Sequence, residues 1–168
     1  MKKLLTAVII VAAFAVNAAA DSPVKFSLFD QIAGPKTEKA NLVIGLIDNN
    51  TPEVVGLSTF SLSNRADSLT GVQFYGFYNR ASDMKGVQVG LLNRTQEATG
   101  AQLSAVSLAG KMTGFQYGIY NQADNFTGLQ LGFVNNINTI EKGLQIGLVN
   151  IIKNNGWLPF MVIVNGRF

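Results

Sequence analysis

Short stretches of alternating apolar and polar positions, each opening on a glycine, follow one another along the chain. Residues 114–121 read Gly-Phe-Gln-Tyr-Gly-Ile-Tyr-Asn, so that Phe115, Tyr117 and Ile119 alternate with glutamine and glycine. Successive side chains of a β-strand point to opposite faces, and strict alternation therefore predicts a strand with one buried face. A helix would need apolar residues every three or four positions and would be weakened by the glycines. The pattern predicts strands whose apolar side chains are buried.

The stretch recurs with a period of 14 or 15 residues, which is the signature of a repeat architecture. Full copies open at Gly56, Gly71, Gly86, Gly100, Gly114, Gly128 and Gly143. The segment between copies holds most of the charges, yet one apolar residue recurs shortly before each new copy: Leu69, Met84, Ala98, Met112, Phe126 and Ile140. A solvated loop would not keep an apolar residue at one fixed place, so this position is expected to be buried.

Two all-β architectures fit this pattern. In a β-solenoid, each unit of 14–15 residues is one coil, and equivalent residues stack about 4.8 Å apart along the axis. In a small antiparallel outer-membrane β-barrel of 8–10 strands, the apolar residues face lipid while Gln, Gly and Asn line the interior. The terminal stretch 160–168 alternates and ends on Phe168, which resembles the assembly signal of such barrels. The direction of successive copies separates the two, and the solenoid is the first choice.

Two sets of polar residues are the candidate site residues. In a solenoid, the asparagines that end the copies would form a structural ladder at one corner: Asn64, Asn79, Asn93, Asn121, Asn135 and Asn150. The glutamines in third place would form a second ladder on the outer face, and this ladder is a candidate binding face: Gln73, Gln88, Gln102, Gln116, Gln130 and Gln145. We expect an unidentified protein or glycan as the partner.

Residues 1–20 have the three parts of a secretory signal peptide. Lys2 and Lys3 form the positive region, residues 4–16 are apolar, and residues 18–20 offer an A-x-A cleavage site. A membrane span would need about 20 apolar residues. We therefore predict a signal peptide over 1–20, an N-terminal cap over 21–40, and a β-repeat domain over 41–168 that ends in a closing strand. The expected location is the periplasm, the outer membrane or the cell surface.

The composition excludes several kinds of catalytic and metal site. The chain has no Cys and no His, so cysteine nucleophiles, zinc–thiolate sites and the commonest general base are missing. The formal net charge of +3 includes Lys2 and Lys3, and without them it is +1, which gives no basic stripe for nucleic acid. We expect no catalysis, no metal, no cofactor and no nucleic-acid partner.

The copies Gly128-Leu-Gln-Leu-Gly-Phe-Val-Asn135 and Gly143-Leu-Gln-Ile-Gly-Leu-Val-Asn150, followed by Trp157-Leu-Pro-Phe, carry a family likeness. Over residues 56–168 the chain resembles exported bacterial surface-repeat proteins, known from spirochaetes and other bacteria, with tandem Gly-Leu-Gln-Ile-Gly-Leu-Ile-Asn copies. Some of these are lipoproteins, from which this chain departs because it lacks the cysteine. The resemblance implies an exported, envelope-associated protein with a structural or interaction role. A pore or anchor is the alternative.

Overall fold

The computed structural model describes residues 21–29, 32–34, 36–59 and 61–168, and the predicted signal peptide lies outside these residues. The strands are β1 (Asp21–Phe29), β2 (Ile32–Gly34), β3 (Lys39–Gly45), β4 (Asp48–Asn50), β5 (Glu53–Thr59), β6 (Ser63–Asn154) and β7 (Phe160–Arg167). Among the residues described, no helix has the length and apolar character needed to cross a membrane.

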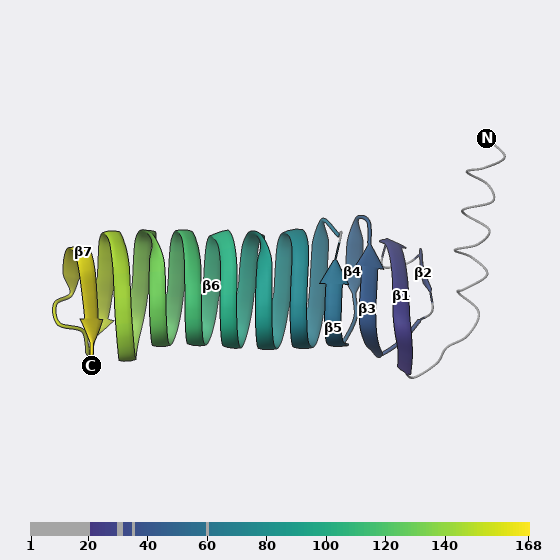
Figure 1. The fold of residues 1–168 in the computed structure, drawn as a ribbon, viewed down its shortest axis with the longest axis horizontal. Helices are drawn as coiled ribbons and strands as arrows, with labels where there is room; N and C mark the ends of the chain where they lie inside the picture. Colours follow the sequence, from purple (N-terminus) through teal and green to yellow (C-terminus); the bar gives the residue numbers. More distant parts are fainter. Residues whose placement is uncertain (1–20, 30–31, 35, 60) are drawn as a thin grey trace.

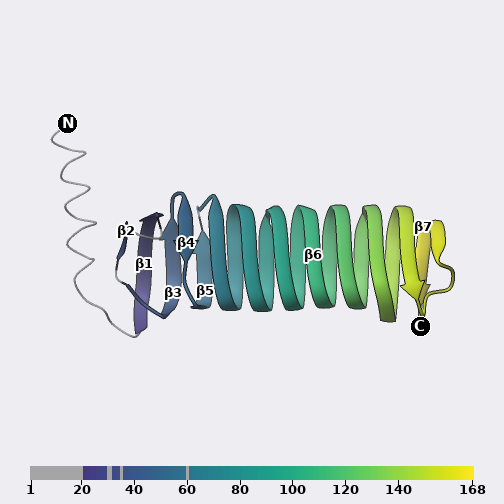
Figure 2. The same cartoon turned by 180° about the vertical axis from the view of Figure 1, so that it is seen from behind.

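Successive copies run in the same direction and stack in register. Strand β1 pairs in parallel with β3, β3 with β5, and β5 with β6. The register between β5 and β6 places Gly56 beside Gly71 and Leu57 beside Val72. Strand β6 then winds through coil after coil in a straight column (Figures 1 and 2). The β-solenoid prediction is confirmed, and the alternative of an antiparallel barrel is wrong because neighbouring copies are parallel.

An antiparallel strand closes each end of the parallel stack. At the N-terminal end, β2 pairs antiparallel with β1. At the C-terminal end, β7 pairs antiparallel with the last coil, from Gly143 to Ile151. Exposed strand edges invite pairing with other chains, and a short reversed strand limits that risk. The predicted cap over 21–40 therefore divides into β1, which extends the array by one strand, and β2, which turns back across its edge.

The interior holds three kinds of inward-facing side chain. The apolar residues that precede each copy are buried, as predicted: Leu69, Met84, Ala98, Met112, Phe126 and Ile140. A second buried row comes two residues after each asparagine or its equivalent: Ala66, Ala81, Thr95, Ala109, Ala123, Ile137 and Ile152. The glutamine and asparagine side chains of the copies fill the rest of the interior.

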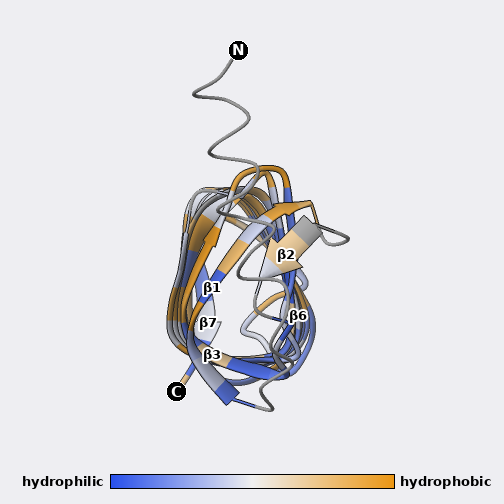
Figure 3. Ribbon diagram, turned by 90° about the vertical axis from the view of Figure 1, so that its right-hand side faces the viewer, coloured by the Kyte–Doolittle hydropathy of each residue, from blue (hydrophilic) through white to orange (hydrophobic). Residues whose placement is uncertain are grey.

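The apolar side chains within the copies face outward, which corrects the prediction that they are buried. Tyr117 and Ile119 are exposed, whereas Gln116, directly before Tyr117, is buried. A glycine lies at the inward position between the last two apolar residues because the asparagines need its space: a Cβ at Gly132 would lie 2.5 Å from Nδ2 of Asn121. Seen along the axis, polar segments gather on one side of the coils and apolar segments on the other (Figure 3).

Candidate functional site

The six glutamines offered as a binding face are all fully buried. In five of them, Nε2 donates to Oε1 of the glutamine one coil earlier, over 2.6–3.1 Å. We call this row, from Gln73 to Gln145, the glutamine ladder. The prediction of an outer glutamine face is wrong, because an amide that bonds to its own copies above and below can be buried at little cost. These residues hydrogen-bond coil to coil in the interior and do not form part of the outer surface.

The asparagines that end the copies also form a fully buried row, which we call the asparagine ladder. Nδ2 of Asn64, Asn79, Asn121 and Asn135 donates to Oδ1 of the asparagine one coil later, over 2.9–3.1 Å. The donors of this ladder point toward the C-terminus, whereas those of the glutamine ladder point toward the N-terminus. The amide dipoles of the two ladders therefore oppose each other within one interior.

Ser107 interrupts the asparagine ladder. It bonds to Ser104 at 2.8 Å, and Ser104 itself donates to the carbonyl of Val106 at 2.7 Å. Asn93 donates to the carbonyls of Gln88 and Leu103 instead of to a side chain in the next coil. Oδ1 of Asn121 is consequently buried without a hydrogen-bond partner among the described residues. A buried acceptor in this condition costs about 1–3 kcal/mol.

We expect the double substitution Ser104→Gly and Ser107→Asn to raise the unfolding free energy by about 1–2 kcal/mol, because it completes the ladder. Ser107→Asn alone is expected to bring no gain, since a Cβ at the equivalent Gly76 would lie 2.2 Å from Oδ1 of Asn79. Guanidinium unfolding of both single variants and the double variant completes a double-mutant cycle. Additive effects would contradict the steric link between the two positions.

The solenoid carries a continuous apolar surface on the outside of the same strands. We define the apolar face as three outward rows in the copies between 71 and 150. The rows are Val72, Val87, Ala101, Phe115, Leu129 and Leu144; Phe74, Val89, Leu103, Tyr117, Leu131 and Ile146; and Phe77, Leu91, Ala105, Ile119, Phe133 and Leu148. The third row is the most open, with Phe77 63% and Leu148 63% exposed.

The contiguous area of the apolar face is larger than that of apolar residues scattered singly over a protein surface. Six coils spaced by about 4.8 Å, each contributing about 17 Å of strand length, cover a flat area of roughly 500 Å². Projecting side chains add to this area. The largest apolar patch on an ordinary monomer is about 300–600 Å² and is often functional. No position in the three rows carries a charge. The apolar face therefore ranks with the largest patches of monomeric proteins and is the candidate functional site.

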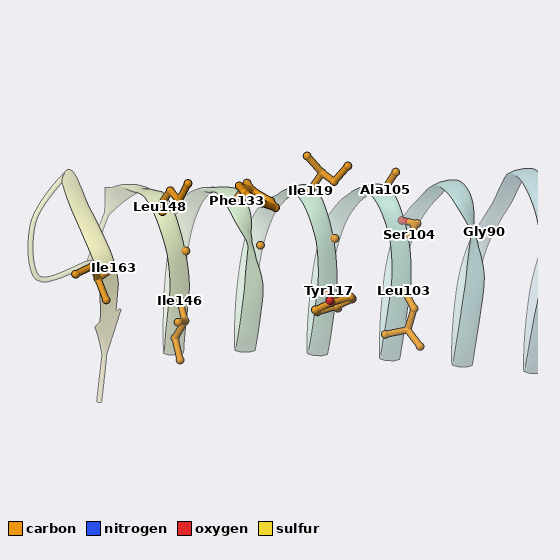
Figure 4. A pocket seen from close by; sticks show the side chains of 13 residues that line it. Gly90, Leu103, Ser104, Ala105, Tyr117, Ile119, Phe133, Ile146, Leu148 and Ile163 are labelled. Carbon is orange, nitrogen blue, oxygen red and sulfur yellow. The ribbon is translucent and has the colours of Figure 1, made fainter.

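A groove of about 670 Å³ runs along the apolar face, parallel to the solenoid axis. Its floor is the row of inward glycines, including Gly118, Gly132 and Gly147. Figure 4 shows the side chains on its two sides: Leu103, Tyr117 and Ile146 on one, and Ala105, Ile119, Phe133 and Leu148 on the other. Ile163 of β7 lies at the C-terminal end and is 70% exposed. The glycines thus leave space for the asparagine ladder on the inside and deepen the groove on the outside.

Basic residues lie along the two edges of the apolar face. The residues directly after the asparagines include Arg65, Arg80 and Arg94, and the residues directly before the opening glycines include Lys85 and Lys142, all exposed. Glu141, next to Lys142, is the acid nearest to these edges in sequence. The other acids of this region lie in the middle of the polar segments, farther from the face: Asp67, Asp83, Glu97 and Asp124.

The apolar face consists almost entirely of side chains that can only make apolar contacts. Its rows contain one kind of titratable group, the phenol of Tyr117. Among the described residues, no three His, Cys, Asp or Glu side chains gather where they could hold a metal ion. The hydrogen bond and charge of Glu53 raise the pKa of Lys39, but this pair lies on β3 and β5, outside the three rows. The face can bind by covering apolar area.

Reasoning from the sequence missed the apolar face because it assigned the alternating apolar residues to the core. A usable signal was present in the repeat. Each unit already has two buried positions outside the alternating stretch of the copy, such as Met112 and Ala109, and a coil of 14 or 15 residues has little room for more. The recurrence of a glycine near Asn also marks a crowded inward side.

Comparison of the chain with protein-family models, with curated proteins and with solved structures finds no match. The likeness to exported surface-repeat proteins rests on the motifs of the repeat copies.

Proposed function

We propose that the protein is an exported, envelope-associated scaffold with an interaction role and no catalytic step. The observation that carries this proposal is the uncharged apolar face, because a patch of this size on a soluble surface marks a site of interaction. The signal-peptide pattern of residues 1–20 supports export. The partner contacts the face with apolar groups, which a glycan offers less readily than a protein or a lipid does.

The two ladders give this surface a fixed shape. The glutamine and asparagine side chains behind the apolar face are bonded from coil to coil, for example Gln130 to Gln116 at 2.6 Å and Asn135 to Asn150 at 2.9 Å. A surface that is already ordered loses little conformational entropy on binding, and this raises affinity. The polar interior thus supports an interaction role for the apolar exterior.

A photo-crosslinking amino acid in place of Phe133 tests the proposal in cells that produce the full chain. Phe133 is 59% exposed on the apolar face, and Asn125, exposed on the polar side, is the matched control position. We expect a crosslinked product in the envelope fraction from position 133 and none from position 125. Equal crosslinking from both positions, or recovery of uncleaved chain in the cytoplasm, would overturn the proposal.

A further inference from the structure

We infer that the apolar face docks on the surface of an anionic lipid bilayer, an inference that rests on the proposed function and names its partner. A peripheral protein of this kind places apolar side chains about 5–10 Å into the boundary between headgroups and acyl chains. The three uncharged rows supply these side chains. The groove runs between the row of Tyr117 and the row of Ile119, and a lipid acyl chain could lie in it.

The charge distribution around the face favours anionic headgroups. The edges carry Arg65, Arg80, Arg94, Lys85 and Lys142; Glu141 adjoins Lys142 in sequence, and Asp48 pairs with Arg65. Neither ion pair found among the described residues includes Arg80 or Arg94; these pairs join Lys39 to Glu53 and Arg65 to Asp48. Basic groups near an anionic surface each strengthen binding, and the effect fades within a Debye length of about 10 Å.

The order of apolar, basic and acidic residues matches the layers at a bilayer surface, which are hydrocarbon, anionic headgroups and water. The apolar rows are outermost on one side, and Arg80 is exposed three residues after Phe77, the last residue of the apolar face in that copy. Asp83 and Asp124 lie in the middle of the polar segments, on the side that would face water. The column of coils is straight, so its long side can lie along a planar surface (Figure 1).

A second copy of the chain fits this face less well. Face-to-face pairing would match the apolar rows, but it would also bring the basic edges of the two copies alongside each other. Wherever basic groups of the two copies met, they would face like charges instead of phosphate groups. Like charges set against each other at an interface disfavour association. The edge charges therefore favour lipid over self-association.

Flotation of the full chain with vesicles tests the inference. The probes are vesicles of phosphatidylcholine alone and of phosphatidylcholine mixed with phosphatidylglycerol, and every variant keeps the same N-terminal segment. We expect stronger binding to the mixed vesicles and a loss of about 25-fold there for Arg80→Gln with Arg94→Gln, at about fivefold per arginine. Lys111→Gln with Lys153→Gln removes the same charge from the polar side and is expected to change binding by less than about threefold.

Ile119→Ser with Phe133→Ser is expected to lower binding to both vesicle types by at least tenfold, while the circular dichroism spectrum stays that of the parent. Unchanged binding of the arginine variant, or no binding of the parent chain, would overturn the lipid inference. If the parent chain does not bind vesicles, sedimentation equilibrium tests whether a second copy of the chain covers the face instead. A dimer that Ile119→Ser with Phe133→Ser dissociates would show that a second copy covers the face, and the proposed interaction role would survive without the lipid.

Discussion

Gly114→Ala is expected to destabilise the solenoid by about 4 kcal/mol or more. The φ angle of Gly114 is 132°, a value that residues with a side chain rarely adopt. A Cβ built at this position lies 2.1 Å from the carbonyl oxygen of Gly100 in the preceding coil. Backbone strain and steric overlap therefore act together.

Local adjustment cannot relieve this overlap because the obstructing atom belongs to stacked backbone. The opening glycines form one row with φ between 132° and 144°, and from Gly71 onward each lies against the one before it. The carbonyl oxygen of Gly114 is in turn 1.9 Å from the Cβ that would be built at Gly128. A displacement at one coil would be passed to its neighbours. The opening glycines are thus needed for the 14–15-residue stacking itself.

Guanidinium unfolding followed by circular dichroism measures the effect, with Thr113→Ala as the control. Thr113 is the exposed neighbour of Gly114, and its replacement is expected to change the unfolding free energy by less than about 0.5 kcal/mol. A Gly114→Ala variant within about 1 kcal/mol of the parent chain would show that the glycine row is not the tight contact described above.

The parallel solenoid could be predicted from sequence because its cause is local and repeated. The opening glycines, the asparagines and the buried residue before each copy recur at one period, and only stacking in one direction brings like residues together. The two ladders follow from the same argument. The period alone puts Asn121 and Asn135 in one row, and the hydrogen bond of 2.9 Å between their side chains lies along that row.

The polarity of the coil could not be predicted in the same way. Alternation identifies two faces of a strand but not which face is inside, and the usual rule places the apolar face inward. Here the rule fails because the amide of Gln116 finds hydrogen-bond partners in both neighbouring coils when it points inward, whereas the side chain of Ile119 needs none. On the side of the copies, the protein combines the parallel stacking of a solenoid with the inward polar and outward apolar side chains that are typical of a membrane barrel.

The ends of the array were the least predictable part. Strand β1 has none of the repeat residues, yet its register with β3 places Lys25 beside Val43, and so in line with the glutamine row. Lys25 is buried and bonds to the carbonyl of Asn50. Its place depends on a partner 25 residues away, which no local pattern reveals.

Gln116→Glu is expected to destabilise the solenoid by several kcal/mol at pH 7 and by much less at pH 4. Gln116 is fully buried, its Nε2 donates to Oε1 of Gln102 at 2.8 Å, and its Oε1 accepts from Gln130 at 2.6 Å. The substitution keeps the shape of the side chain and replaces the donor with an oxygen. A carboxylate would then face the oxygen of Gln102 while buried without a cation.

The sign of the pH dependence follows from the burial. Burial raises the pKa of the new carboxyl above its ordinary value of about 4.3, and its protonated form can again donate to Gln102. A group whose pKa is higher in the folded state favours folding below its unfolded pKa, and that contribution is lost as the pH rises through the folded pKa. The difference in unfolding free energy between variant and parent should therefore widen steadily from about pH 4 toward neutral pH.

Gln122→Glu is the matched control, since it makes the same chemical change six residues away on the outside of the coil. Gln122 is only half-buried, and its Oε1 accepts from the Tyr120 hydroxyl at 3.0 Å, a bond that a carboxylate also accepts. We expect its unfolding free energy to follow that of the parent at each pH, to within about 1 kcal/mol. Parallel pH curves for Gln116→Glu and the parent would mean that water reaches the glutamine ladder. The apolar face would then lose the dry, fixed support on which its proposed role depends.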